Sequence, residues 1–238
     1  MKKITLAMII ALFSFSVASA SELGLNVGVS LNGAVFHATG KSTNDETNGA
    51  NEVHSDDATG VAAYGEYFIE KTLWNSGPLS RVAVGYSLNP DALSTETAEN
   101  NQFDISNAAD TTSTGTSGNA SGGGGVARVN TVQVDFEDLT TIYVSAMLTE
   151  SMYVKMGTVE VDVITNESLA TGSSYGNTSL DGTMIGAGSQ FELPFGLFGR
   201  VEATYMEFDG KSLSSNDNTI ELKDLEGASG KLSIGKAF

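Results

Sequence analysis

Apolar and polar residues alternate with a period of two along much of the chain. The first example begins at Leu23, where every second residue up to Leu31 is apolar and the residues between are small or polar. Such alternation places the two sets of side chains on opposite faces of a β-strand. Seven more segments repeat the pattern, and the eight predicted strands cover residues 23–32, 59–74, 79–88, 128–148, 152–165, 183–193, 199–208 and 220–238.

The alternation alone leaves two architectures open. In a soluble sandwich the apolar faces meet each other, whereas in a membrane barrel they face lipid and the small polar faces line the interior. A membrane barrel would turn Val132, Val134 and Phe136 outward. It would also turn Val159 and its neighbours outward, with Glu160 inside. Lys155 falls in the apolar register of that strand, which indicates a bulge there.

The lengths of the connections favour the barrel. Short turns fall at residues 75–78, 149–151 and 194–196, and long polar segments at 38–58, 89–127, 166–182 and 209–219. Short and long connections alternate in strict order, as they do where a barrel has short periplasmic turns and long extracellular loops. The sequence therefore predicts an all-β, eight-stranded, antiparallel up-and-down transmembrane β-barrel.

The N-terminal segment has the three parts of a secretory signal peptide. Lys2 and Lys3 precede an apolar run over residues 4–17, and the small-x-small site Ala18-Ser19-Ala20 follows. The apolar run is shorter than the ~20 residues of a spanning helix. We expect residues 1–20 to be cleaved, leaving residues 21–238 as one barrel domain with Ser21 at its start.

Composition narrows the range of partners. The chain has 27 glycines, 3 prolines and no cysteine, which permits long strands and excludes a disulfide framework. Its net charge of −17 becomes −19 once the two signal-peptide lysines are removed. So acidic a protein repels phosphate backbones, and nucleic acid is not expected as a partner.

Several aromatic residues are expected near the short-turn end, where an interfacial girdle would lie. They are Trp74, Phe191, Phe195, Phe198 and Phe238.

The C-terminal segment over residues 230–238 resembles the terminal signature of outer membrane β-barrel proteins. Leu232, Ile234 and Phe238 match its alternating apolar positions and final phenylalanine, whereas Lys236 departs from the pattern. With the signal peptide and eight strands, the chain resembles the small barrels of the OmpA transmembrane-domain, OmpX and OmpW type. The resemblance implies insertion by the barrel assembly machinery into the Gram-negative outer membrane, with its lipid and lipopolysaccharide as partners.

The predicted interior face carries charges of both signs. We expect Glu66, Glu70, Arg81, Arg200, Glu202 and Lys231 to line the lumen, with Glu160 and Glu192 on the same face. Eight strands leave an interior just wide enough for side chains, so these charges should pair as a polar plug. A narrow channel for ions or small solutes is the alternative, because mixed charges also line wet pores.

The predicted loops contain no chemical motif. Residues 89–127 are expected to form a mobile extracellular loop, which contains a low-complexity tract without apolar content at residues 106–125. Acidic residues are frequent, but no calcium-loop spacing occurs, and neither metal nor cofactor is predicted. The only histidines, His37 and His54, lack the matched nucleophile and carboxylate of a hydrolase. We therefore predict a non-enzymatic barrel with a structural or surface-interaction role, whose loop partner the sequence does not identify.

Overall fold

The computed structural model describes residues 24–44, 52–74, 76–95, 98–104, 126–168, 175–215 and 218–238. Strands dominate these residues, with two short 3-10 turns, η2 (Pro78–Arg81) and η3 (Pro194–Gly196). The strands are β1 (Leu25–Asn44), β2 (Glu52–Thr72), β3 (Val82–Asn89), β4 (Leu93–Ser94), β5 (Ala98–Asp104), β6 (Val126–Met147), β7 (Met152–Ser168), β8 (Thr178–Leu193), β9 (Leu197–Phe208), β10 (Lys211–Ser215) and β11 (Asn218–Ala237).

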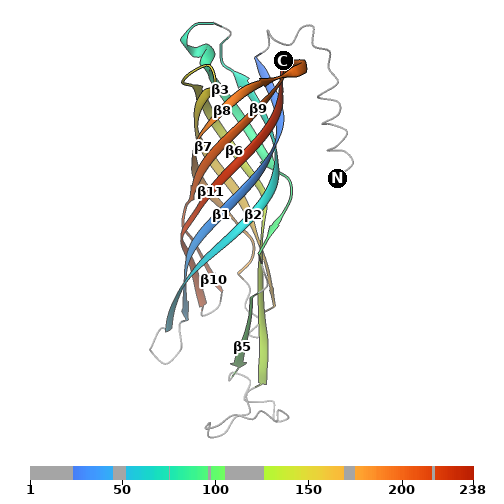
Figure 1. Cartoon of the computed structure of the whole chain (residues 1–238). Helices are drawn as coiled ribbons and strands as arrows, with labels where there is room; N and C mark the ends of the chain where they lie inside the picture. The colour runs from blue at the N-terminus through green and yellow to red at the C-terminus, as the bar shows by residue number, and fades with distance from the viewer. Residues whose placement is uncertain are drawn as a thin grey trace.

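Eight of these strands close into a ring in the order β1-β2-β3-β6-β7-β8-β9-β11, and β11 returns to β1. Every pairing in the ring is antiparallel. The ring appears in Figure 1 as a tall, narrow barrel of tilted strands. The predicted all-β fold with eight antiparallel strands is confirmed.

The pairing register fixes the geometry of the barrel. A line of paired residues that leaves Val61 on β2 and passes through β1, β11, β9, β8, β7, β6 and β3 returns to β2 at Lys71, ten residues further on. A stagger of this size requires the strands to tilt by roughly 35–45° from the barrel axis. The interior of an eight-stranded barrel is then just wide enough for side chains or one small ligand.

The two ends of the barrel differ. Short connections join β2 to β3, β6 to β7 and β8 to β9 at the end where the chain terminates, at the top of Figure 1. At the opposite end the strands extend beyond the predicted bounds: β1 continues to Asn44 and β2 begins at Glu52. The segments expected to be loops therefore contain strand, including β4, β5 and β10.

This part of the loop prediction is wrong for a physical reason. Strand pairing depends on backbone hydrogen bonds, which polar side chains do not prevent, as the polar β5 shows by pairing with β6. Residues 105–125, with the low-complexity tract, lie outside the described residues, as does the predicted signal peptide. Among the described residues, no helix is long and apolar enough to cross a membrane.

The outer face of the ring carries a belt of exposed apolar side chains, here called the apolar belt. Because a folded protein in water rarely exposes so large a continuous apolar surface, the belt marks an interaction with an apolar medium. Its members come from all eight ring strands: Leu31, Val35, Ile69, Val84, Tyr86, Ile142, Val144, Val154, Met156, Ile185, Val201, Tyr205, Leu232 and Ile234.

A bulge in β6 reverses the two faces of that strand. Glu137 pairs with Asp162 and Thr140 with Glu160, so Asp138 and Leu139 together oppose Val161. Asp138 has the positive φ of 52°, and one extra residue shifts the alternation by one position. Ile142 and Val144 consequently face outward, whereas Leu139 packs with Val134 and Phe136 in the interior. The predicted outward orientation of Val132, Val134 and Phe136 was based on an unbroken period of two, and it is wrong for Val134 and Phe136.

The orientation predicted for β7 is also corrected. Its pairing with β8 is continuous from Met152 to Val163, so no bulge lies at Lys155. Lys155 and Val159 are buried on one face, and Glu160 is exposed on the other. Val159, Val161 and Val163 therefore point inward, opposite to the prediction, whereas Val154 nearer the short turns faces outward.

Candidate functional site

A group of ion-paired side chains fills the half of the lumen nearer the short turns, and we call it the charge cluster. At one side of it Arg200 on β9 binds Glu70 on β2, with Nη1 donating to Oε1 at 2.7 Å and Nη2 to Oε2 at 2.6 Å. Tyr143 Oη donates a further hydrogen bond to Glu70 Oε1 at 2.9 Å. Arg200 Nε donates to Gln190 Oε1 at 2.9 Å. The two parallel bonds between Arg200 and Glu70 fix both the position and the orientation of the guanidinium.

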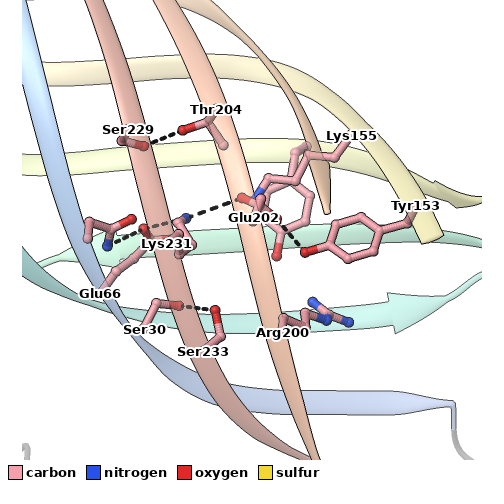
Figure 2. Close-up of polar contacts among 12 residues, drawn as sticks. Ser30, Glu66, Tyr153, Lys155, Arg200, Glu202, Thr204, Ser229, Lys231 and Ser233 are labelled. Carbon is pink, nitrogen blue, oxygen red and sulfur yellow. Dashed lines mark hydrogen bonds and ion pairs between the residues drawn. The ribbon is translucent and has the colours of Figure 1, made fainter. Parts of the chain in front are cut away.

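The other side of the charge cluster is centred on Glu202 (Figure 2). Lys155 Nζ donates to Glu202 Oε1 at 2.8 Å and Tyr153 Oη donates to Oε2 at 2.7 Å. Lys231 Nζ lies 3.7 Å from Glu202 Oε1 and donates to both oxygens of Glu66, at 2.9 and 2.7 Å. These contacts join β2, β7, β9 and β11 across the lumen.

The charges within the charge cluster balance. Three carboxylates (Glu66, Glu70, Glu202) face three cations (Lys155, Arg200, Lys231), and every one of the six has an ion-pair partner. Their side chains have relative exposures of 10% or less. An unpaired charge in so buried a place would carry a large desolvation penalty, which pairing offsets. Matched charges therefore fill this part of the lumen.

Aromatic rings enclose the cations. The Arg200 guanidinium carbon lies 4.7 Å from the centroid of the Phe198 ring, 5.3 Å from that of Tyr153 and 5.4 Å from that of Phe68. Lys155 Nζ lies 4.2 Å from the Tyr143 centroid. Cations at these distances are attracted by the electron-rich ring faces, most strongly where water is excluded.

Serine and threonine pairs continue the polar interior. Ser30 and Ser233 share a hydrogen bond of 2.9 Å between their hydroxyl groups, and Thr204 and Ser229 share another. Asn32 Nδ2 donates to Glu66 Oε2 at 3.3 Å.

The structure brings together five of the six residues predicted to line the lumen: Glu66, Glu70, Arg200, Glu202 and Lys231. Arg81 ends η2 at the short-turn end, where its side chain is exposed, and is not part of the charge cluster. Glu160 and Glu192 are also exposed. The sequence pattern missed Lys155, which the assumed bulge had removed from the interior. Its signal was a lysine on a strand face that has no other charge within the predicted strand at residues 152–165.

Other predicted positions are distributed as follows. Trp74, Phe191 and Phe195 are exposed near the short-turn end. Phe198 is buried against Phe68 and Arg200, and Phe238 is buried against Val27, so neither is part of a surface girdle. Leu232 and Ile234 lie in the apolar belt, and the Phe238 backbone pairs with that of Leu25. Among the described residues, no group of three histidine, aspartate or glutamate side chains could hold a metal ion.

Comparisons with known proteins give weak structural similarities. No protein-family model and no curated protein sequence matches the chain. The structure of Ail, the attachment invasion locus protein of Yersinia pestis, in complex with the heparin analogue sucrose octasulfate, aligns over 89% of this chain and 99% of its own, at 13% identity and a TM-score of 0.36. A Pseudomonas aeruginosa FadL homologue aligns over 90% of both chains at 10% identity and a TM-score of 0.34. The Pseudomonas putida toluene transporter TodX covers 76% of this chain and 50% of its own, at 10% identity and a TM-score of 0.24.

Similarity this low carries no statement about function. The class is defined by the chain's own strand pairing, which closes eight antiparallel strands into an up-and-down β-barrel. That is the architecture of the small outer membrane barrels that the sequence resembles.

Proposed function

We propose that the chain is an integral protein of the Gram-negative outer membrane, with a closed lumen and a non-enzymatic role in envelope structure or surface interaction. The main evidence is that apolar side chains lie outside and charged side chains inside, the reverse of the arrangement in a soluble protein. Leu31, Ile142 and Leu232 are 55–62% exposed on the outside, whereas Glu70 and Glu202 are at most 5% exposed inside. A closed barrel with its apolar side chains outside fits a lipid environment, because lipid offers the backbone no hydrogen-bond partners and ring closure pairs neighbouring strands with each other.

Three observations support the proposed location in the outer membrane. They are the signal-peptide pattern over residues 1–20, the terminal positions Leu232, Ile234 and Phe238, and the apolar belt. The proposed partners are accordingly the lipid and lipopolysaccharide of the outer membrane and, during biogenesis, the barrel assembly machinery.

Cell fractionation combined with a heat-modifiability gel tests this assignment. The protein should be found in the outer membrane fraction, with Ser21 as its first residue by mass spectrometry. Its unboiled form should migrate differently from its boiled form, because a closed barrel resists unfolding by detergent. Recovery from the soluble periplasmic fraction, with no change of mobility on boiling, would contradict the proposal.

The charge cluster favours a closed lumen over the alternative of a narrow channel. Ion pairs such as Lys231 with Glu66 occupy the space that a solute would need. Planar bilayers should show no resolved single-channel conductance for the wild-type protein. Stable unitary currents from the wild type would support the channel instead.

A further inference from the structure

A large apolar cavity lies in the half of the barrel nearer the long connections, on the other side of the charge cluster. Its volume of about 580 Å³ falls within the ~300–1,000 Å³ range of pockets for small organic molecules. Among the residues that the structure describes, no charged side chain lines it. Its walls come from β1, β2, β4, β6, β7, β9 and β11: Phe36, Ala38, Ala58, Thr59, Gly60, Val61, Ala62, Leu93, Ser94, Thr95, Phe136, Leu139, Val161, Phe208 and Leu225.

Four ring strands share one sequence pattern at the cavity, an apolar residue between two acids. The patterns are Asp135-Phe136-Glu137, Glu160-Val161-Asp162, Glu207-Phe208-Asp209 and Asp224-Leu225-Glu226, on β6, β7, at the end of β9 and on β11. All four central residues line the cavity, while six of the eight flanking acids are exposed and Asp135 and Glu137 are half-buried. The alternation is thus reversed here, with apolar side chains inside and acids outside.

The reversal indicates that this section of the barrel stands in water rather than lipid. Carboxylates on the outer wall are costly in hydrocarbon. The change occurs along single strands: on β9 the outward-facing Tyr205 of the apolar belt is followed by Glu207, and on β7 Met156 is followed by Thr158 and Glu160. A wall that meets water on the outside therefore encloses an apolar interior, which water fills poorly.

The cavity has a floor and a side opening. Leu139 separates it from the polar layer that contains Tyr64, Glu66 and Lys231, so the charge cluster blocks passage along the axis. On the side, β2 pairs with β3 only from Tyr67 to Thr72 in the described parts of the chain, and β4 pairs with β6. Residues 58–62 of β2 and 93–95 at β4 line the cavity from these two edges, and Val61 is 83% exposed.

From this geometry we propose that the cavity is a binding site for a small, uncharged, mainly hydrocarbon molecule taken from the aqueous side. The apolar walls favour such a molecule, and the surrounding carboxylates disfavour anions. The hydroxyl groups of Ser94 and Thr95 at one edge can bond one polar group of the ligand. A lipid acyl chain is the less favoured occupant, because it would have to leave the bilayer and pass the acidic wall.

A tryptophan reporter in the cavity tests the proposal. The single native tryptophan, Trp74, is exposed at the opposite end, so Trp74→Phe combined with Phe136→Trp isolates the cavity signal. In dimyristoyl phosphatidylcholine vesicles, 1-bromonaphthalene should quench the reporter saturably, and naphthalene should compete. The anion 4-bromo-1-naphthoate should bind at least about tenfold more weakly because of the acidic surroundings. In the wild-type protein, quenching of Trp74 measures the effect of 1-bromonaphthalene that has only partitioned into the lipid.

Two adjacent alanines provide a matched control. Ala62 lines the cavity and Ala63 is exposed on the outer face. In the reporter background, Ala62→Phe should fill the cavity and weaken binding by about tenfold or more, whereas Ala63→Phe should leave binding unchanged. Ala38→Phe, on the neighbouring strand and also facing the cavity, is a second filling variant.

Three outcomes would overturn the proposal. The first is quenching of the reporter that rises linearly with 1-bromonaphthalene, as it does for Trp74. The second is equal binding of the ligand by Ala62→Phe and Ala63→Phe. The third is quenching of the reporter by phospholipids with brominated acyl chains, reversed when naphthalene is added. The last would assign the cavity to lipid tails. A heat-modifiability gel of each variant reports the barrel separately, so a failed site is distinguished from a failed fold.

Discussion

Arg200 and Glu70 form a bidentate ion pair across the lumen, with two hydrogen bonds of 2.7 and 2.6 Å between β9 and β2. The two strands are not neighbours in the ring, so the pair is a tertiary contact that strand pairing does not enforce. With both side chains buried, each charge depends on the other for its solvation.

Breaking this pair on one side should destabilise the barrel strongly. Arg200→Met leaves Glu70 as an uncompensated buried carboxylate, at an expected cost of about 3–5 kcal/mol in the free energy of unfolding. Adding Glu70→Gln to Arg200→Met should recover much of that loss, because the unpaired charge is then removed. Urea midpoints of protein refolded into lipid vesicles measure both effects.

Arg81→Met is the control, because Arg81 is exposed in η2. It should shift the unfolding free energy by no more than ~0.5 kcal/mol. If Arg81→Met lowered the free energy of unfolding as much as Arg200→Met, the effect would not be specific to the buried ion pair.

Gly85 on β3 should not tolerate a side chain. A Cβ built on Gly85 would overlap the ring of Tyr143 on the paired strand β6, and that ring is held by the hydrogen bond to Glu70. Gly85→Val should therefore lower stability by about 1–3 kcal/mol. The same change at Gly33, which has no atom within 4 Å of its Cβ position, should be much milder. Equal losses in the two urea titrations would exclude close packing against Tyr143 as the cause.

The parts of the fold predictable from sequence are those where the period of two is unbroken. On β9 the alternation correctly assigns Arg200 and Glu202 to the interior and Val201 to the outer face. Since a strand's neighbours do not change which face a side chain is on, local sequence is enough for this assignment. It does not show which charges meet, because Arg200 and Glu70 are 130 residues apart and lie on strands that are not adjacent.

The orientations predicted wrongly lie where the surroundings of the barrel's outer surface change from lipid to water. On β7 the valines around Val161 are as apolar as a lipid-facing row, but the acids beside them stand in water and the valines face the cavity. Apolar residues mark the drier face of a strand, and that face changes from outside to inside along the barrel. The bulge at Asp138 escapes detection as well, since no glycine marks it.

Asp138 should be replaceable by residues that accept a left-handed backbone. Its φ of 52° is disfavoured for residues with a branched Cβ, whereas glycine and asparagine accept it. Asp138→Val is expected to cost about 1–2 kcal/mol, while Asp138→Gly and Asp138→Asn should be near neutral. Urea midpoints in vesicles rank the three variants. A neutral valine variant would contradict the left-handed bulge and the face reversal on β6 that depends on it.

The last prediction concerns where the apolar belt ends. Ile185 and Asp181 lie on the same strand and the same outward face, four residues apart, and both are exposed. Ile185→Arg should place a charge in the hydrocarbon and cost about 2–4 kcal/mol in vesicles if the belt is centred in the bilayer. Asp181→Arg should be neutral or stabilising by up to about 1 kcal/mol, because Asp181 pairs in register with Glu160 and directly opposed like charges are unfavourable. Refolding both variants into vesicles of two acyl-chain lengths adds a second criterion, since only the Ile185 variant should respond to bilayer thickness. Equal losses of unfolding free energy at both positions would place the acidic wall, and the cavity with it, inside the bilayer. If the stability of neither variant depended on lipid, the barrel would not span a membrane.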